Sequence, residues 1–371
     1  MIAIPSYAQT GQDWWYTLEL GKKSFREGSY GDALLHFEDA RRQRRAMYER
    51  MEKDMIDFLS LTPVRRLSNS LDKVDAFARE RRYDGASAAL DEAYFRFPKA
   101  DFSDSAIAVL EALGRMKNYP EAEYWIGETY RVEGELSLAL AQYQKVWDQR
   151  DSLEQKAFET DIMYKIANVH KTLQDYYNME RKLLGVLDQD ALWSTGDGAD
   201  ISVRTSEHNA QNAFARNAMR RTLENEGVGR FLALYRYINM PVEQAHRLLG
   251  LYYYASGRHH NALEHLMFAF LIQSSVIIEE VIRHDFDFEF SSLDGLMPYI
   301  NRFSLISDYV NTVDFYRTAY YLGCSLHVNG KTPAARTLWS FLAFHAPAGE
   351  WQNRARSQLR QPQVERIVER P

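Results

Sequence analysis

The sequence predicts an all-α fold made of helix pairs that stack on one another. The stretch from 242 to 271 is the clearest pair, because apolar residues recur at helical spacing on both sides of a break at Gly257. A glycine at that point suits the left-handed backbone at the end of a helix. A helix pair of this kind cannot bury its apolar faces alone, so it needs similar pairs packed against it. Such pairs recur elsewhere in the chain.

Composition narrows the class of protein further. The chain has 371 residues, of which 46% are hydrophobic and 26% charged, which is typical of a folded chain. A formal charge of -6 argues against a protein that binds duplex nucleic acid, which needs an excess of Lys and Arg. The single cysteine, Cys324, excludes an intrachain disulfide framework and a cysteine-based zinc cage. Because of the negative charge, we expect no nucleic-acid partner.

Residues 1–10 resemble the end of a secretory signal. A short apolar run precedes Ser6 and Ala8, and cleavage after Ala8 fits the preference of the signal peptidase for small residues. This pattern predicts export to the periplasm, and a cytoplasmic protein with an ordinary N-terminus is the alternative. We expect no transmembrane segment, because the most apolar run, 263–282, carries Glu264, Glu279 and Glu280 and fits a buried helix better.

Residues 11–193 are predicted to form an N-terminal array of helix pairs. A pair spans 13–45, and its second helix continues toward Leu61 because no breaker precedes Pro63. A weaker pair covers 68–98, and a single helix covers 103–117. A strong pair at 120–147 and a looser one at 160–187 complete this array.

Residues 194–200, STGDGAD, are the predicted linker. The second array, 201–361, begins with one or two helices broken near Gly227 and Gly229. The pair at 242–271 and a further pair at 314–347 follow, and a helix from Glu350 to about Leu359 caps the stack. Residues 362–371 are polar and are predicted to form a flexible tail.

The same residue types recur in the same order in the pairs: an apolar residue followed by glycine, an aromatic residue three positions after the glycine, a second glycine, and then alanine with a large apolar residue four positions on. An example is Ile126-Gly127, Tyr130, Gly134, Ala139 and Tyr143. This order, with a repeat near 34 residues, resembles the tetratricopeptide repeat (TPR) family. Clear copies start near Trp14, Pro120, Glu243 and Tyr316, and weaker ones near Leu67 and Thr160. The first copy has Ser24 where the family has an aromatic residue, and stretches 201–240 and 275–312 do not match. The resemblance implies a right-handed solenoid with irregular inserted helices.

The resemblance also implies that the first helix of each pair lines a concave groove. Mixed aromatic and charged residues suit the anchors and polar edges of a bound protein segment. The cluster of Lys and Asn with which some family members hold a C-terminal carboxylate is missing. The implied groove residues are Trp15, Leu18, Lys22, Phe25, Tyr124, Glu128, Arg131, Arg247, Leu251, Tyr254, Arg317, Tyr320 and His327.

No catalytic, cofactor or metal site is predicted. Gly330-Lys331-Thr332 lacks the earlier glycine and the strand of a phosphate-binding loop. His259, His260 and His265 have no further ligand at metal-binding spacing. The basic run Arg41, Arg42, Arg44 and Arg45 is interpreted as a solvated helix face, with an anion-binding site as the alternative.

Residues 284–290, HDFDFEF, alternate between aromatic and acidic side chains. In an extended strand Phe286, Phe288 and Phe290 would share one side. Two interpretations are open. The segment is either a connector whose rings fill the chain's own groove, or an edge that pairs with a partner's strand.

The sequence therefore favours a non-catalytic scaffold that binds one or more proteins, through a peptide or a folded surface, with self-association as a further option. The usual roles of the tetratricopeptide repeat family, together with the export signal, indicate a bacterial envelope assembly. Examples are a flagellar-motor accessory, an outer-membrane assembly or a transport complex. The alternative function is a periplasmic adaptor that delivers a hydrophobic small molecule to a transporter. An apolar pocket with a few convergent polar groups is the feature that would favour it.

Overall fold

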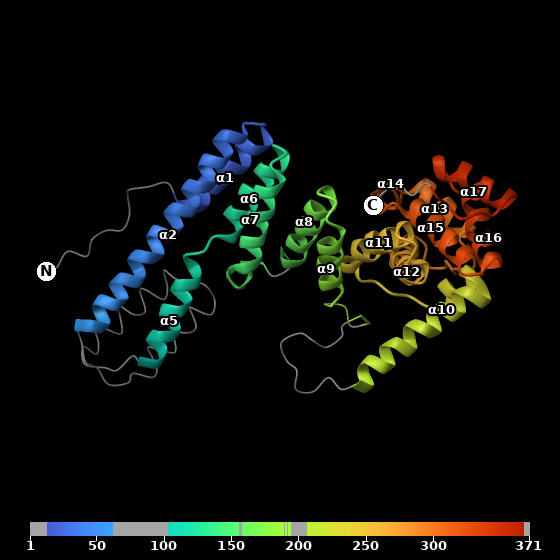
Figure 1. Cartoon of the computed structure of the whole chain (residues 1–371), viewed down its shortest axis with the longest axis horizontal. Coiled ribbons are helices and arrows are strands. Elements are labelled where there is room, and N and C mark those ends of the chain that lie inside the picture. Colours follow the sequence, from blue (N-terminus) through green and yellow to red (C-terminus); the bar gives the residue numbers. More distant parts are fainter. Residues whose placement is uncertain are drawn as a thin grey trace. The chain divides into compact units, whose positions relative to one another are not determined.

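The computed structural model describes residues 13–61, 103–155, 158–188, 190, 192–193 and 206–366. These residues form helices joined by short connections, with no β-strand among them (Figure 1). The all-α class is therefore confirmed. The predictions for residues 1–10, the weaker pair at 68–98 and the linker at 194–200 lie outside the described residues. The chain divides into two compact units, 1–169 and 170–371.

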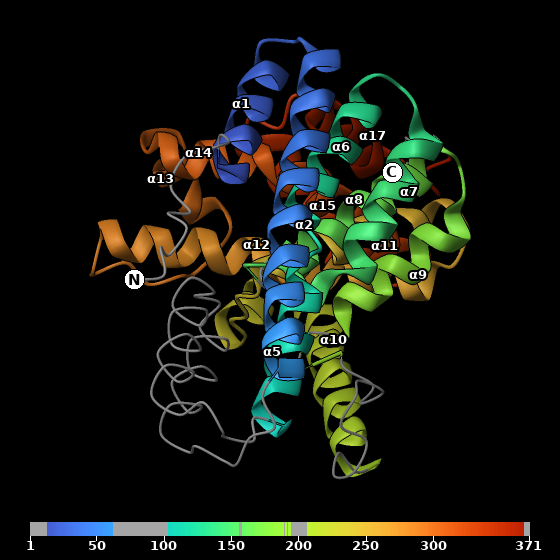
Figure 2. The same cartoon turned by 90° about the vertical axis from the view of Figure 1, so that its left-hand side faces the viewer.

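The described part of the first unit contains two helical hairpins, with α5 and the start of α8 beside them. Helix α1 (Trp14–Arg26) packs on α2 (Tyr30–Leu61), and α6 (Pro120–Val132) packs on α7 (Leu136–Asp148). Helix α2 runs unbroken to Leu61, as the absence of a breaker predicts, and also contacts α5 (Ser103–Met116) and α6 (Figures 1 and 2). A 3-10 turn, η1 (Arg150–Ser152), leads to α8 (Phe158–Thr172), within which the two units divide.

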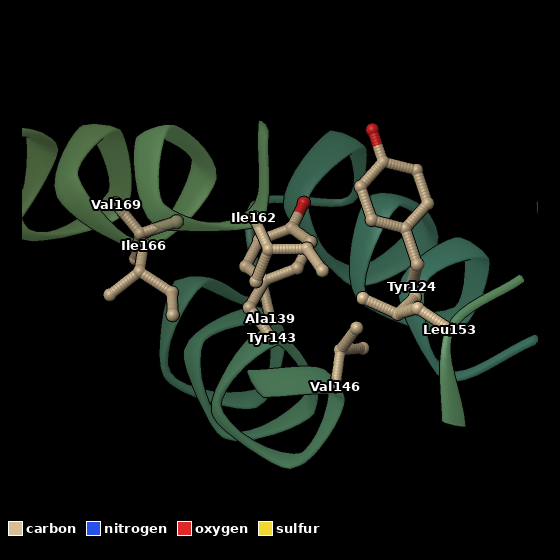
Figure 3. Packing of buried hydrophobic residues seen from close by; sticks show 8 residues of the cluster. All are labelled: Tyr124, Ala139, Tyr143, Val146, Leu153, Ile162, Ile166 and Val169. Atoms are coloured by element: carbon tan, nitrogen blue, oxygen red, sulfur yellow. The ribbon is translucent and has the colours of Figure 1, made fainter. Parts of the chain in front are cut away.

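Two apolar clusters join the described helices of the first unit. One lies where α1 and α2 meet the start of α6 and includes Phe37 and Ile126, both almost fully buried. The second joins α6, α7 and α8, whose side chains point toward one another in Figure 3. Burial of this much apolar surface is the main favourable contribution to folding. The second cluster consists of Tyr124, Ala139, Tyr143, Val146, Leu153, Ile162, Ile166 and Val169.

The second unit is built around one long helix, α12 (His259–His284), which packs between α11 (Met240–Ala255) and α15 (Phe315–Val328). Helix α9 (Tyr176–Leu187) lies on α11, and α10 (Ser206–Leu234) is kinked at Gly227, where the sequence predicts a break. The remaining elements are η2 (Asp294–Leu296), α13 (Met297–Arg302), α14 (Ser304–Thr312), α16 (Thr332–Ser340), the π-helical turn η3 (Phe341–His345) and α17 (Glu350–Arg360).

Helix α12 is long and apolar enough to cross a bilayer, and it is the one such helix among the described residues. Within its unit, 78% of the most apolar stretch is buried. Phe268, Phe270 and Ile277 have no exposed surface. This arrangement is that of a core helix, which is how the sequence interprets the run 263–282.

Among the described residues, four hairpins pack their two helices together with the same residue spacing. In each, a glycine of the first helix lies against a large side chain sixteen residues later, so close that a Cβ atom would lie 2.5 to 2.9 Å from it. A second glycine, seven residues after the first, turns the chain with φ between +76° and +84°. An alanine on the second helix is fully buried. The close pairs are Gly21–Phe37, Gly127–Tyr143, Gly250–Leu266 and Gly323–Trp339.

Candidate functional site

The residues that the resemblance assigns to a groove differ widely in exposure. Trp15 and Arg131 are exposed, whereas Leu251, Tyr254 and Tyr320 are at most 2% exposed. Leu18, Tyr124 and Glu128 are also buried, because the first helix of each pair packs on more than its own partner. These six residues pack inside their units. Half-buried positions are Lys22, Phe25, Arg247, Arg317 and His327.

An exposed aromatic pair marks the start of α1. Trp15 is 53% exposed and Tyr16 is 44% exposed, and their ring centroids lie 6.1 Å apart. Large rings with this much accessible surface are typical anchors in protein interfaces. Of the predicted groove, Trp15 is therefore the aromatic residue best placed to meet a partner.

Glu128 has a structural role in the first unit. Its carboxylate accepts hydrogen bonds from Arg131 at 2.8 Å and from the Tyr143 hydroxyl, and it pairs with Lys165 at 3.0 Å. Burial disfavours the charged form, but the hydrogen bonds from Arg131, Tyr143 and Lys165 outweigh it and lower the pKa of Glu128. The carboxylate thus links α6, α7 and α8.

A basic pocket of about 300 Å³ opens beside a second buried carboxylate, Glu123. Arg41 donates to both oxygens of Glu123, at 3.0 and 3.1 Å, and Lys145 approaches at 2.5 Å. Two cations thus share one anion. The pocket is lined by Arg41, Arg42, Arg45, Lys117, Asn118, Tyr119, Glu123, Lys145 and Gln149. Arg42, Arg45 and Lys117 pair with Asp39, Glu49 and Glu52 respectively.

Arg44 does not lie on the solvated helix face that the sequence predicts for it. The side chain is fully buried, and its guanidinium lies 4.7 Å from the ring centroid of Trp14 and 4.5 Å from that of Tyr119. Its Nε donates to the backbone oxygen of Met116 at 3.1 Å. The interpretation of this run as solvent-facing is wrong for Arg44, because aromatic rings and a carbonyl replace its water.

The second unit carries a polar site on the face of α11 and α15. Its centre is the pair Tyr254 and Tyr320, and we call it the Tyr254–Tyr320 face. The Tyr320 hydroxyl donates to the carboxylate of Glu365 at 2.6 Å, and the Tyr254 hydroxyl accepts from the Glu365 backbone N–H at 3.2 Å. Burial raises the pKa of both tyrosines and of Cys324 beside them. Residues 362–366, predicted as flexible, thus contact this face.

The segment 285–290 does not form the predicted strand. Helix α12 ends at His284, and a turn closed by a hydrogen bond from the Phe288 N–H to the Asp285 carbonyl follows. The three rings separate accordingly. Phe286 is 89% exposed, Phe288 lies 5.1 Å from the Tyr299 ring, and Phe290 lies 5.3 Å from the Arg236 guanidinium. The turn at 286–287 interrupts the strand, so the alternation does not hold through the segment.

His265 lies apart from His259 and His260, with which the sequence groups it. It is buried against His246, with the two Nδ1 atoms 3.1 Å apart, and Trp193 stacks on its ring at 4.6 Å. Burial lowers the pKa of His246 far below its ordinary value and that of His265 to about 3, with the charge of Arg216 acting in the same direction. Both rings are therefore neutral near pH 7.

Several residues of these sites carry no sequence signal. Glu123 is a buried polar residue whose helix shows only ordinary amphipathic spacing. Glu365 lies in a polar stretch without periodicity, 111 positions from the tyrosine that its backbone contacts. No local pattern identifies such a contact.

A scan against models of known protein families finds no match. The chain is similar to an uncharacterized protein of Treponema pallidum (strain Nichols), with 25% identity over 350 residues, which is 94% of this chain and 90% of that protein. It is also similar to an uncharacterized protein of Borreliella burgdorferi (strain ATCC 35210 / DSM 4680 / CIP 102532 / B31), with 22% identity over 285 residues, 72% of this chain and 86% of that protein. The first similarity extends through both compact units.

Proposed function

We propose that the chain is a non-catalytic adaptor built from TPR-like helical hairpins, which binds a protein partner in a bacterial envelope assembly. The observation that supports the proposal most is the shared register of four hairpins, from Gly21–Phe37 to Gly323–Trp339. Repeated hairpins of this kind bury a continuous core and leave extended surfaces for other proteins. The signal-like pattern that ends at Ala8 supports export to the periplasm.

The buried titratable groups of the described residues are engaged in packing. Glu123 and Glu128 link helices, and the rings of His246 and His265 pack against each other and Trp193. These contacts link helices within each unit, as expected of residues with a structural role.

The small-molecule alternative has less support. The basic pocket is lined by five cations. A second pocket, of about 380 Å³, combines Val228, Leu293 and Phe341 with Arg336, Asp294 and His345. A site for a hydrophobic ligand is expected to have predominantly apolar walls. The cations of the basic pocket therefore favour a polar ligand there.

Site-specific photo-crosslinking in native cells tests the adaptor function. A photoreactive phenylalanine analogue replaces Trp15, and in a matched control it replaces Leu35, which is 62% exposed on α2 of the same hairpin. We expect one discrete crosslinked protein from position 15 and none from position 35, because only the first helix of each pair is assigned to the groove. Equal crosslinking from both positions, or none from either, would contradict the assignment.

A separate experiment tests whether the protein is exported. A fusion of the N-terminal residues through Trp15 to alkaline phosphatase, which is active only after export, reports whether the segment directs secretion. We expect activity, and expect replacement of Ala8 by a bulky charged residue to leave the exported fusion at its uncleaved length, since signal cleavage needs a small side chain there. An inactive wild-type fusion would show that this segment does not direct export.

A further inference from the structure

The C-terminal segment 361–366 leaves α17 in an extended conformation and lies on the Tyr254–Tyr320 face. Gln361 has φ -143° and ψ 93°, and the segment has no helical hydrogen bonds of its own beyond that point. The backbone N–H of Gln363 donates to the Gln358 amide oxygen at 2.9 Å, and that of Glu365 donates to Tyr254. Alternate residues thus point their N–H groups to the protein, as in a bound extended peptide.

The contacts show which chemistry the face accepts. Hydroxyl and amide groups hold the peptide backbone, which any extended chain offers. The Tyr320 hydroxyl, itself contacted by the Gln358 amide at 3.5 Å, adds a hydrogen bond to a carboxylate. Arg317 and Arg354 are close enough to act electrostatically on the neighbouring Tyr321, as Glu365 does. An acidic side chain is therefore favoured over a neutral or basic one.

The segment is held lightly. Val364 is 48% exposed, and Gln363 and Arg366 are exposed as well, so little apolar surface anchors it. Hydrogen bonds of an exposed segment open more easily than a packed core. The residues beneath, in contrast, belong to the core of the unit, with Tyr254 and Tyr320 at most 2% exposed.

We propose that the Tyr254–Tyr320 face is a binding groove for an extended, carboxylate-bearing segment of a protein partner, and that residues 361–366 occupy this groove in the free chain and are displaced by the partner. This inference rests on the proposed adaptor function and names the kind of partner. A tethered occupant competes at an effective concentration in the millimolar range. A partner segment must therefore bind better than the tail or offer further contacts elsewhere.

Fluorescence anisotropy tests the groove with a labelled peptide of residues 360–366, RQPQVER, amidated at its C-terminus. The full-length chain is compared with its Glu365→Ala variant, whose tail has lost the carboxylate contact. We expect the variant to bind the peptide at least tenfold more tightly than the wild type, because the competing tail is weakened. Glu350→Ala, which removes an exposed acid at the start of α17, is the matched control and should leave the affinity unchanged.

Two further comparisons test the chemistry. A peptide with glutamine in place of Glu365 should bind the Glu365→Ala chain at least fivefold more weakly, since the charged acceptor is lost. Adding Tyr254→Phe and Tyr320→Phe to that chain should reduce binding by a similar factor or more, while an unchanged thermal unfolding curve shows that the core is intact.

Equal affinity of the wild type and Glu365→Ala for the peptide would overturn the proposal. An affinity that Tyr254→Phe and Tyr320→Phe leave unchanged would overturn it as well. A wild-type dimer that the peptide dissociates would assign the face to the tail of a second copy and would overturn the partner assignment. Failure here is distinguishable from failure of the adaptor function, because crosslinking at Trp15 in the other unit does not involve the tail.

Discussion

Gly250 on α11 lies directly against Leu266 on α12. A Cβ atom at position 250 would lie 2.6 Å from the Leu266 Cγ and 3.0 Å from its backbone nitrogen. A flexible side chain can move aside, but the backbone of a fully buried helix moves only with its neighbours. The two helices can therefore approach this closely only because residue 250 has no side chain.

Gly250→Ala should destabilise the second unit by about 1–3 kcal/mol, the range for overpacking a core. Gly229→Ala is the matched control within the same unit, because its nearest contact, the Ser291 backbone oxygen, would be at an ordinary 3.7 Å. Urea unfolding of the full chain measures both. An equal unfolding midpoint for the two variants would show that the helices do not pack as closely as described.

This relationship explains which parts of the fold the sequence predicts well. The spacing of Gly250, Gly257, Ala262 and Leu266 reflects contacts between neighbours in the chain, and each position has a local requirement for size or backbone angle. Periodicity therefore places the hairpins to within a few residues. The absence of a breaker before Pro63 predicts that α2 continues to Leu61, and the glycines at 227 and 229 predict the kink in α10.

Contacts between distant residues are not predictable in this way. Arg44 belongs to a charged run that suggests a solvated face, yet it is enclosed by Trp14 and Tyr119 from elsewhere in the chain. Tyr254 has the position of a groove residue, but its exposure depends on the packing of its whole unit. An aromatic residue contacts solvent or the core depending on which side of its helix it lies and on what packs there. Helical spacing alone does not show what packs against a given side.

Arg44→Ala should destabilise the first unit by about 2–4 kcal/mol. The substitution removes a fully buried side chain that packs on two rings and satisfies the Met116 carbonyl, so it leaves both a cavity and an unpaired acceptor. Arg42→Ala provides the comparison, since that side chain is 73% exposed and should change stability by no more than about 0.5 kcal/mol. Similar losses for both variants, measured by urea unfolding, would argue against the buried position of Arg44.

The stability of the second unit should fall as the pH is lowered below about 6.5. His246 and His265 have depressed pKa values in the folded chain, because burial and then nearby positive charge disfavour their protonation, whereas both protonate freely when unfolded. The unfolded state thus binds more protons, and each histidine contributes a loss of about 1.4 kcal/mol per pH unit well below 6.5. For His265 this loss continues toward its folded pKa of about 3.

Urea unfolding at pH 7.5, 6.5 and 5.5 measures this dependence in a range where most carboxylates stay ionised. The double variant His246→Phe/His265→Phe should show a flatter profile, even if its stability at pH 7.5 is lower. His345→Phe, at a 48% exposed position, should keep the wild-type slope. A wild-type profile that is flat between pH 7.5 and 5.5 would mean that the histidine pair is accessible to water.

Phe286 and Phe288 should respond to the same substitution to different extents, because the turn after α12 separates their rings. Phe288→Asp places a charge beside Tyr299 in a half-buried position and should cost about 1–2 kcal/mol. Phe286→Asp changes a residue that is 89% exposed and should cost less than about 0.5 kcal/mol. Urea unfolding of the two variants separates the turn from the alternating strand, in which both rings would share one side and both substitutions would have a similar effect.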